Sequence, residues 1–501
     1  MATMELEYMR LPKHRRIAHK FANFFKSIPS TLVAVFFAIG RFFKRAAQTV
    51  VDVFRDIVLT WKNGDYKTRT SYFIMGFGNI ARGQILRGVL FLLFEVVFIL
   101  YMALFGGAYM LKIGSLGTVV TYKDDEGVTV YGDNSFNILL YGVISIFFII
   151  AFVYTWYANI KQNKIAQEIA ATGKPLKSGK EDLQSLIDDQ FHKTLMALPL
   201  LGILIFTVLP IFFMILVAFT NYDGQHYPPA KLFTWVGFDN FAGLFNLSES
   251  GVNFGSTFGS ILLWTLIWAF FATFTNYFLG MVVAMIINKK GIKLKKLWRT
   301  VLVVSIAIPQ FISLMYVSKI FAADGLINQL YRYLSGNPEN FSPLPFWTDT
   351  MWARITVILI NIWIGIPYLM LITSGILMNI PSDLYESAKI DGASPVKMYF
   401  KITLPYMLFV TGPYLLSSFI GNMNNFNVIY LLSGGAPVDI ELTGGAGHTD
   451  LLITWLFKLT VDSSNYKLAS VIGILVFIVV AFISVIVYNI IPSMKNEEDF
   501  Q

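Results

Sequence analysis

Residues 468–491 read LASVIGILVFIVVAFISVIVYNII, an apolar run without a single charged side chain. The hydrocarbon core of a bilayer is about 30 Å thick and accommodates about 20 apolar residues as a helix. Lipid offers no hydrogen-bond partners to backbone N–H and C=O groups, so a spanning segment of this kind must be helical. The run therefore predicts a membrane-spanning helix.

The remainder of the chain has the same apolar character. Of its 501 residues, 55% are hydrophobic and 14% are charged, whereas ordinary soluble domains carry about 25% charged residues. The 45 Phe, 24 Tyr and 10 Trp residues exclude intrinsic disorder. With no cysteine, disulfides and thiolate metal sites are excluded as well. The composition predicts a protein that is embedded in the lipid bilayer. No nucleic acid partner is expected.

Seven further stretches are long and apolar enough to span, so the sequence predicts an all-α, polytopic membrane protein with about eight transmembrane helices. The eight stretches cover approximately residues 88–111, 138–158, 196–220, 257–288, 298–322, 352–377, 406–432 and 468–491. The fourth exceeds one upright span, so it tilts or begins as an interfacial helix.

The distribution of Lys and Arg predicts the orientation, because loops rich in these residues stay cytoplasmic. Segments on one side of the predicted spans hold 31 Lys and Arg residues, and segments on the other side hold 5. The basic side comprises residues 1–87, 159–193, 289–299, 378–405 and 492–501. Both termini are therefore predicted to be cytoplasmic.

The amino-terminal region, residues 1–87, contains an apolar run at 31–43 that is too short to span. Lys26, Arg41, Lys44 and Arg55 surround this run, a pattern typical of a basic amphipathic helix on the inner leaflet. An arm used in packing or assembly is an equally good interpretation.

Searches for catalytic and cofactor motifs are negative. The segment GKPLKSGKE at 173–181 departs from a phosphate-binding loop in its glycine spacing and has Glu181 where Ser or Thr would hold magnesium. The five histidines are scattered without metal-ligand spacing. We expect no enzymatic activity, no metal and no cofactor bound by this chain. Glu95, the acidic residue well inside a predicted span, is interpreted either as an ion site or as an interhelical hydrogen-bond partner.

The cytoplasmic segment 380–405, IPSDLYESAKIDGASPVKMYFKITLP, has the pattern of a helix, a turn and a second helix. Ser382 or Asp383 can cap a helix over 384–390, and Gly392 permits the sharp turn that ends it. Pro395 can begin a second helix, and Pro405 is expected to end that helix before the next span. A short amphipathic helix of this type suits docking in a groove of another protein, although an ordinary connecting loop has the same pattern.

This segment resembles the EAA loop of the membrane subunits of binding-protein-dependent ABC importers, whose pattern is EAA, then DGA, then I-x-LP. The EAA position holds Glu386, Ser387 and Ala388, and DGA stands at 391–393. The I-x-LP position holds Ile402, Leu404 and Pro405. The resemblance implies that Glu386, Ser387, Ala388, Asp391 and Gly392 transmit the closure of a separate ATPase subunit to the spans.

The resemblance covers approximately residues 191–492 and is strongest to the MalF-type permease subunit of maltose and maltodextrin importers. Matching stretches are NIWIGIPYLM (361–370), SSFIGNMNNFNVIYLLSGGAP (417–437) and GHTDLLITWLF (447–457). It implies a type I ABC importer permease fold with a six-helix core at 191–492 that contains the coupling loop 380–405. Residues 1–87 would form a cytoplasmic region, 88–190 two additional spans with a linker, and 493–501 a cytoplasmic tail.

The spans of this core contain amide, hydroxyl and aromatic groups and almost no charge, which predicts a neutral solute. Sugar hydroxyls can pair with amides, and their C–H faces can pack on aromatic rings. Ser418, Asn422 and Asn425 are spaced to share one helical face, as are Gly365 and Tyr368, and Pro309 and Pro367 are expected to interrupt their helices. Such polar groups also commonly link helices to one another. The family resemblance implies that Ser313, Gly365, Tyr368, Ser418, Asn422 and Asn425 surround the sugar.

The resemblance also implies the partners and the location. A MalG-like second permease subunit, two ATPase subunits that bind ATP and magnesium, and an extracellular sugar-binding protein would complete an importer in a bacterial cytoplasmic membrane. The glycine-rich outer loop after residue 432 resembles the loop that enters the cleft of the binding protein, whereas residues 221–256 are too short to hold the large insertion of some maltose permeases. An ion-coupled secondary transporter and a membrane-embedded glycosyl transferase are the alternatives. They predict intramembrane ionisable pairs and acidic or histidine clusters, respectively.

Overall fold

The computed structural model describes residue 37 and residues 40–244, 254–289, 291–336 and 341–490. These residues form two compact units, with the division between Gly237 and Phe238. The all-α prediction is confirmed, with one small hairpin in addition, in which β1 (Tyr122–Lys123) pairs antiparallel with β2 (Thr129–Val130). The predicted domain boundaries rest on sequence resemblance and remain predictions.

Seven helices in the described residues are long and apolar enough to cross a membrane, and a bent helix pair brings the number to eight. The seven cover Ile85–Lys112, Ser135–Ala171, Phe191–Val217, Phe254–Asn288, Thr350–Leu377, Pro395–Met423 and Tyr466–Ile486. Each overlaps a predicted span. The fourth is continuous over its whole length, which confirms that this segment exceeds one upright span.

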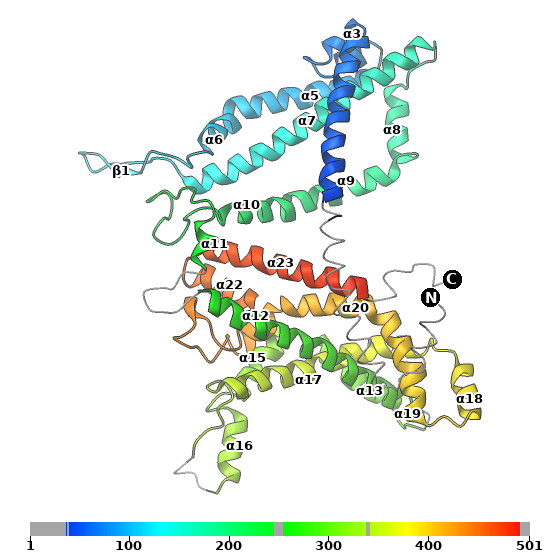
Figure 1. The fold of residues 1–501 in the computed structure, drawn as a ribbon, viewed down its shortest axis with the longest axis vertical. Helices are drawn as coiled ribbons and strands as arrows, with labels where there is room; N and C mark the ends of the chain where they lie inside the picture. The colour runs from blue at the N-terminus through cyan, green and yellow to red at the C-terminus, as the bar shows by residue number, and fades with distance from the viewer. Residues whose placement is uncertain (1–36, 38–39, 245–253, 290, 337–340, 491–501) are drawn as a thin grey trace. The chain divides into compact units, whose positions relative to one another are not determined.

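The first unit contains three of these helices and a short-helix segment at one end of them (Figure 1). Residues 40–63 are helical. The helices that follow are α3 (Tyr66–Thr70), α4 (Phe77–Ile80), α5 (Ile85–Tyr101), η1 (Met102–Gly106), α6 (Gly107–Lys112), α7 (Ser135–Ala171), α8 (Gly179–Ile187), α9 (Phe191–Ile203), η2 (Leu204–Val208) and α10 (Leu209–Val217). The predicted amphipathic run at 31–43 lies mostly outside the described residues.

A buried polar network joins α5 and α7 to the segment between the helix of residues 40–63 and α5. The Glu95 carboxylate on α5 accepts a hydrogen bond from the Met75 backbone N–H at 2.8 Å. Asn159 on α7 accepts from the Gly76 N–H at 2.9 Å and donates to the Ser71 carbonyl at 2.8 Å. Glu95 therefore holds a buried backbone turn, which agrees with the hydrogen-bonding interpretation of this residue.

The second unit contains the remaining spans and the connections between them. Its helices are α11 (Asp239–Gly243), α12 (Phe254–Phe270), η3 (Phe271–Thr275), α13 (Asn276–Asn288), α14 (Lys295–Ala307), α15 (Gln310–Ile320), α16 (Leu326–Leu334), α17 (Thr350–Leu377), α18 (Ser382–Ile390), α19 (Pro395–Met398), η4 (Tyr399–Thr403), α20 (Leu404–Met423), α21 (Phe426–Leu432), η5 (Thr443–Gly445), α22 (Leu452–Val461) and α23 (Tyr466–Ile490).

The predicted fifth span is a bent pair, in which α14 and α15 meet at 92°. Ile308 between them is extended, with φ −80° and ψ 125°. A residue that precedes proline is disfavoured in the helical region, and Pro309 has no N–H to continue the helical hydrogen bonds. The expectation that Pro309 interrupts its helix is therefore confirmed. The same expectation for Pro367 is wrong, because Pro367 lies inside the continuous helix α17.

The predicted seventh span, 406–432, is two helices, because α20 ends at Met423 and α21 begins at Phe426. The Asn425 side chain caps α21 by accepting a hydrogen bond from the Val428 N–H at 3.3 Å. Asn is a favoured N-cap residue, since its side chain satisfies a free backbone donor. The prediction that Asn425 shares one helical face with Ser418 and Asn422 is therefore wrong.

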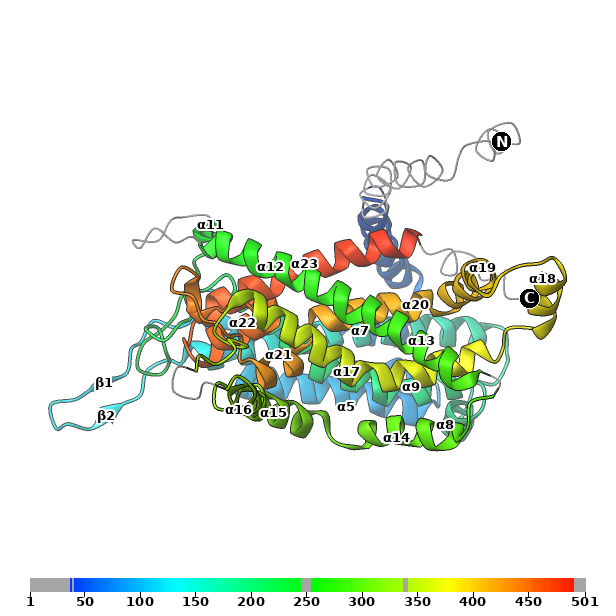
Figure 2. The same ribbon diagram turned by 90° about the horizontal axis from the view of Figure 1, so that it is seen from below.

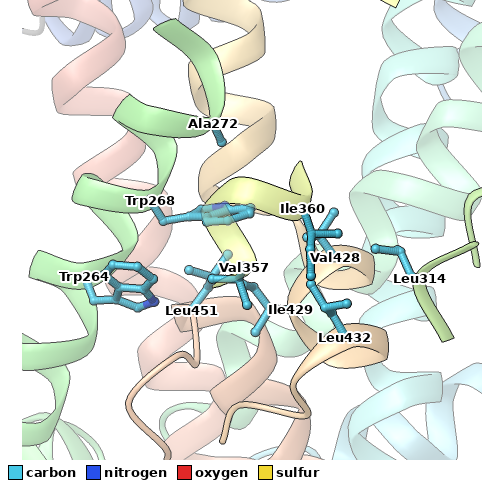
Figure 3. Packing of buried hydrophobic residues seen from close by; sticks show 10 residues of the cluster. All are labelled: Trp264, Trp268, Ala272, Leu314, Val357, Ile360, Val428, Ile429, Leu432 and Leu451. Carbon is cyan, nitrogen blue, oxygen red and sulfur yellow. The ribbon is translucent and has the colours of Figure 1, made fainter. Parts of the chain in front are cut away.

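A hydrophobic cluster holds the broken elements together (Figure 3). Trp264, Trp268 and Ala272 follow one side of α12 and η3, and Val428, Ile429 and Leu432 of α21 lie between this side and Leu314 of α15. The remaining members are Val357 and Ile360 of α17 and Leu451. Leu314, Val428 and Trp268 are fully buried, so both α15 and α21 are fixed against the long helices.

Replacing Glu95 tests its structural role. Glu95→Leu should lower the free energy of unfolding by about 1–3 kcal/mol, because the buried Met75 N–H loses its acceptor. Glu95→Gln keeps an acceptor oxygen, so its free energy of unfolding should be close to that of the unaltered protein. Thermal unfolding in mild detergent measures both. A normally stable Glu95→Gln protein that has lost transport would instead identify Glu95 as an ion site.

Candidate functional site

The bend between α14 and α15 opens a cavity of about 390 Å³ against α17. All the residues that line it are uncharged, and they combine hydroxyl, amide and aromatic groups with aliphatic surface. They are Ser305, Ile306, Ala307, Ile308, Pro309, Gln310, Ser313, Trp363, Ile364, Gly365 and Tyr368. Three of the six predicted sugar-site residues, Ser313, Gly365 and Tyr368, are thus brought to one cavity by the bend.

Helix α17 supplies the aromatic wall of this cavity. Trp363 and Tyr368 are 56% and 51% exposed, so both rings are available to a ligand. Pro367 lies between them and has no N–H to donate to the Trp363 carbonyl, four residues earlier. This proline does not break α17, but it leaves a backbone acceptor on the residue whose ring lines the cavity.

Gly365 has a packing role in addition to its place in the lining. A Cβ atom at this position would lie 2.8 Å from Cγ of Asn276 on α13, and closer still to the Nδ2 atom of that amide. The Asn276 amide donates to the Asn361 carbonyl at 3.4 Å. The absence of a side chain at Gly365 therefore allows α13 and α17 to approach closely, and a polar contact can form between them.

Of the other three predicted residues, Asn422 and Asn425 form a second group at the junction of α20 and α21, and Ser418 lies one turn before them on α20. The Asn422 amide donates to Thr273 Oγ1 at 3.0 Å, and the Asn425 amide donates to Asn422 Oδ1 at 3.2 Å. Trp268 Nε1 donates to the Asn422 carbonyl at 3.1 Å. Asn422 and Asn425 thus connect the junction to α12 and η3, and the lining of the α14–α15 cavity does not include them.

Tyr414 on α20 lies one turn before Ser418. Its hydroxyl hydrogen bonds with Ser418. Nothing in the sequence singles out Tyr414, Thr273 or Ser305. A single tyrosine, threonine or serine in an apolar span gives no periodic signal, and each becomes notable only through contacts with residues distant in sequence.

The predicted coupling loop forms a helix, a turn and a helix (Figure 1). Gly392 ends α18 in the left-handed region, with φ 71°. The Ala393 N–H donates to the Ala388 carbonyl at 2.9 Å and the Gly392 N–H to the Lys389 carbonyl at 3.0 Å, which is the Schellman pattern of helix termination. The predicted turn at Asp391 and Gly392 is confirmed.

Two details of this loop differ from the predictions. Helix α18 begins at Ser382 after Pro381, without a side-chain cap from Ser382 or Asp383. The second helix does not end at Pro405, because α19 continues through η4 into α20 as one helix, Pro395–Met423. The π-helical turn η4 ends two residues before Pro405, and such a turn accommodates the missing donor of a proline without ending the helix.

The surface of the coupling loop is partly apolar and exposed. Ile390 is 87% exposed, and Leu384 and Val396 are also exposed. Glu386, Ser387, Asp391 and Gly392 are exposed, and Ala388 is half-buried. The Tyr385 hydroxyl hydrogen bonds with Thr403 Oγ1 at 2.8 Å and so fixes α18 to η4. An exposed apolar helix that is fixed to a long helix is suited to receive force from another protein.

The glycine-rich loop between α21 and α22 is held by a buried ion pair. Lys458 Nζ lies 2.6 Å from Asp450 Oδ2, which also accepts the Gly447 N–H at 2.7 Å. Burial raises the pKa of the Asp450 carboxyl, and the Lys458 ammonium opposes that shift. Ile440, near the middle of the loop, is 99% exposed. The loop therefore combines a fixed base with an exposed apolar tip.

Residues 276–495 match the family described as "Binding-protein-dependent transport system inner membrane component". This range includes α13, the bent pair, α17, the coupling loop and the junction of α20 and α21.

Relatives in several bacteria are similar over most of the chain. The galactooligosaccharide transport system permease protein GanP of Bacillus subtilis is 37% identical over 85% of this chain and 97% of its own length. The maltodextrin transport system permease protein MalC of Streptococcus pneumoniae is 34% identical over 85% of this chain and 95% of its own length. A solved bacterial alginate ABC transporter aligns with 61% of this chain and 95% of its own, at 20% identity and a TM-score of 0.48.

Substituting Gly365 tests its packing role. Gly365→Ala should destabilise the protein, because the added methyl group would overlap the Asn276 amide. Thermal unfolding in detergent measures the loss. The matched control is Gly365→Ala combined with Asn276→Ala, which makes room for the methyl group and should recover part of the stability. If Gly365→Ala alone unfolds at the normal temperature, the close approach of α13 and α17 is not required.

Proposed function

Because this chain belongs to the family of inner-membrane permease components of binding-protein-dependent transport systems, we propose that it translocates a neutral oligosaccharide. The single observation that carries the choice of solute is the cavity at the α14–α15 bend, which has hydroxyl, amide and aromatic groups and an uncharged lining. Its volume of about 390 Å³ falls within the range of about 300–1,000 Å³ for small-molecule sites.

The chemistry of the lining supports a sugar over other neutral solutes. Trp363 and Tyr368 offer flat apolar faces for the C–H groups of a pyranose ring. Ser313 and Gln310 offer hydroxyl and amide groups that can both donate to and accept from sugar hydroxyls. The relatives named for maltodextrin and galactooligosaccharide transport agree with this class, so a maltodextrin or a similar neutral oligosaccharide is the proposed cargo.

Ser418, Asn422 and Asn425 are proposed as a second contact region on the same path. Tyr414 hydrogen bonds with Ser418, and the amides of Asn422 and Asn425 form a polar surface where α20 ends. A sugar that passes from one group to the other would exchange hydroxyl and aromatic contacts for amide contacts.

The energy source is proposed to lie outside this chain. Two ATPase subunits with ATP and magnesium, a second permease subunit of the MalG type and an extracellular binding protein would complete the transporter. Glu386, Ser387, Ala388, Asp391 and Gly392 would contact the ATPase through the exposed surface of α18. This assignment is supported by the exposed Leu384 and Ile390 and by the fixed contact between Tyr385 and Thr403.

The orientation follows from the same proposal. The coupling loop and both termini would lie in the cytoplasm, in agreement with the excess of Lys and Arg on that side. The loop between α21 and α22, with its exposed Ile440, would face the binding protein. Docking of the binding protein outside and closure of the ATPase inside would then open the cavity to the two sides of the membrane in turn.

Uptake into proteoliposomes that contain the complete complex tests the function. With binding protein and a labelled maltodextrin outside and ATP inside, uptake should continue when ionophores collapse the proton and sodium gradients. Loss of uptake under ionophores while ATP remains would favour the ion-coupled alternative.

Tyr368→Ala should reduce the rate of sugar uptake strongly and leave thermal stability nearly unchanged, because half of the side chain is exposed. The reason is the loss of the ring face that packs on the sugar. Tyr316→Ala is a matched control: this tyrosine is 73% exposed on α15 and is not among the residues that line the cavity. Equal uptake by the two variants would contradict the placement of the sugar against Tyr368.

Gly392→Pro should abolish the ATP hydrolysis that binding protein stimulates in the complex. Proline requires φ near −65°, whereas Gly392 has φ 71°, and proline also removes the N–H that donates to the Lys389 carbonyl. Gly173→Pro is a matched control, because Gly173 also has φ 71°, just after the end of α7, outside the coupling loop. Normal stimulation in Gly392→Pro, with correct membrane insertion, would refute the coupling role of this turn.

A further inference from the structure

The helix of residues 40–63 carries an exposed apolar stripe. We define the stripe as Phe43, Val50, Phe54, Val58 and Trp61, whose spacing of three, four or seven residues places them on one helical face. These side chains are between 41% and 69% exposed. Five large apolar side chains aligned on one helical face form a surface that is rarely exposed to water.

Basic residues flank this stripe. Lys44, Arg55 and Lys62 are exposed and lie on a common line along the helix, next to the stripe, because they are spaced by eleven and seven residues. We call these three residues the basic flank. An apolar face with adjoining Lys and Arg is the pattern of helices that lie in the interface of an anionic membrane.

Another face of the helix is bound to the first unit. Asp56 Oδ1 lies 2.7 Å from Lys164 Nζ of α7, and the Tyr157 hydroxyl donates to Asp56 Oδ2 at 3.4 Å. Thr60 is buried, and the Ile57 carbonyl accepts the Tyr72 hydroxyl at 2.7 Å. These contacts fix the rotation of the helix, and the side chains of the stripe stay exposed.

The direction of the helix also fits an interface. In Figure 1 the dark-blue helix of residues 40–63 runs across the direction of α5 and α7, and in Figure 2 it is seen nearly end-on while those spans run across the picture. A helix that crosses the span direction lies parallel to the membrane plane.

The contacts between α7 and the helix of residues 40–63 place this helix at one end of the hydrocarbon region. Helix α7 has 37 residues, about 55 Å at 1.5 Å per residue, so it extends beyond a core of about 30 Å. The apolar part of α7 ends near Trp156 and Tyr157, where Asp56 is bound. Trp61, Tyr72 and Trp156 form a cluster of edge-to-face rings at the same level, and such residues are enriched at membrane interfaces.

We propose that the helix of residues 40–63 lies in the plane of the membrane, with its apolar stripe in the acyl boundary and its basic flank bound to the phosphate groups of anionic lipids. An apolar groove on a protein partner would be sufficient to cover the stripe. The in-plane direction, the interfacial aromatic cluster and the line of Lys and Arg beside the stripe together favour lipid.

The chain has no cysteine, so a single engineered cysteine can carry a label at a chosen position of the full-length protein. Phe54→Cys places an environment-sensitive fluorophore on the stripe, and Asp52→Cys places it two residues away on the water-facing side. In vesicles of equal parts phosphatidylcholine and phosphatidylglycerol, the Phe54→Cys label should shift to shorter emission wavelength and be quenched by brominated lipid. The Asp52→Cys label should be quenched by iodide from the water.

Two results would overturn the proposal. Equal quenching of both labels by iodide would show that the stripe is in water. Protection of the Phe54→Cys label from both iodide and brominated lipid would show that protein covers the stripe.

A second variant tests the charge contribution. In the Phe54→Cys protein, brominated-lipid quenching should be stronger in the mixed vesicles than in pure phosphatidylcholine. Replacing Lys44, Arg55 and Lys62 with Gln should remove this difference, since each basic residue near an anionic surface contributes to binding. The Asp56 contact with Lys164 is retained, and unchanged thermal unfolding confirms that the fold is intact. A lipid dependence that persists in the triple variant would refute the role of the basic flank.

Discussion

Pro309 cannot donate a backbone hydrogen bond, and the candidate site depends on this constraint. Without the donor, and with Ile308 forced into an extended conformation, α14 and α15 meet at 92°. The bend and α17 together line the cavity. Leu314, packed against α21, holds α15 in its direction, so the bend is a fixed feature of the packed unit. The backbone groups released at such a break are tolerated within a membrane only where they line a cavity or are buried in protein.

The same residue type has different effects at other positions, and local sequence cannot separate them. Pro367 lies inside α17 without breaking it, and Pro405 follows a π-helical turn in a continuous helix. A proline in an apolar span predicts a lost hydrogen bond, but the outcome depends on whether neighbouring helices hold the segment straight. The spans, the Gly392 turn and the helix that begins at Pro395 could be predicted, because hydropathy, capping and glycine chemistry are local. The requirement for glycine at position 365 could not be predicted, because the Asn276 amide that leaves no room for a side chain there is distant in sequence.

The six residues predicted to surround the sugar illustrate the same limit. Ser313, Gly365 and Tyr368 meet at the bend, which no helical periodicity across 298–322 could indicate. Asn422 and Asn425 are neighbours because a turn and an N-cap bring their amides together at 3.2 Å, and not because they share a helical face. Polar side chains inside spans can thus be identified from sequence, whereas their grouping depends on breaks in the helices.

The continuous helix Pro395–Met423 connects the coupling loop to the polar junction. Its 29 residues span about 43 Å, with the Gly392 turn before one end and Asn422 at the other. Tyr385 fixes α18 to the first part of this helix through Thr403, and Trp268 fixes its last turn to α12 through the Asn422 carbonyl. A displacement of α18 would therefore be passed along this continuous helix, whose far end carries the amides. In the proposed transporter, ATPase closure would need no flexible linker to reach the sugar path, because the helix itself carries the motion.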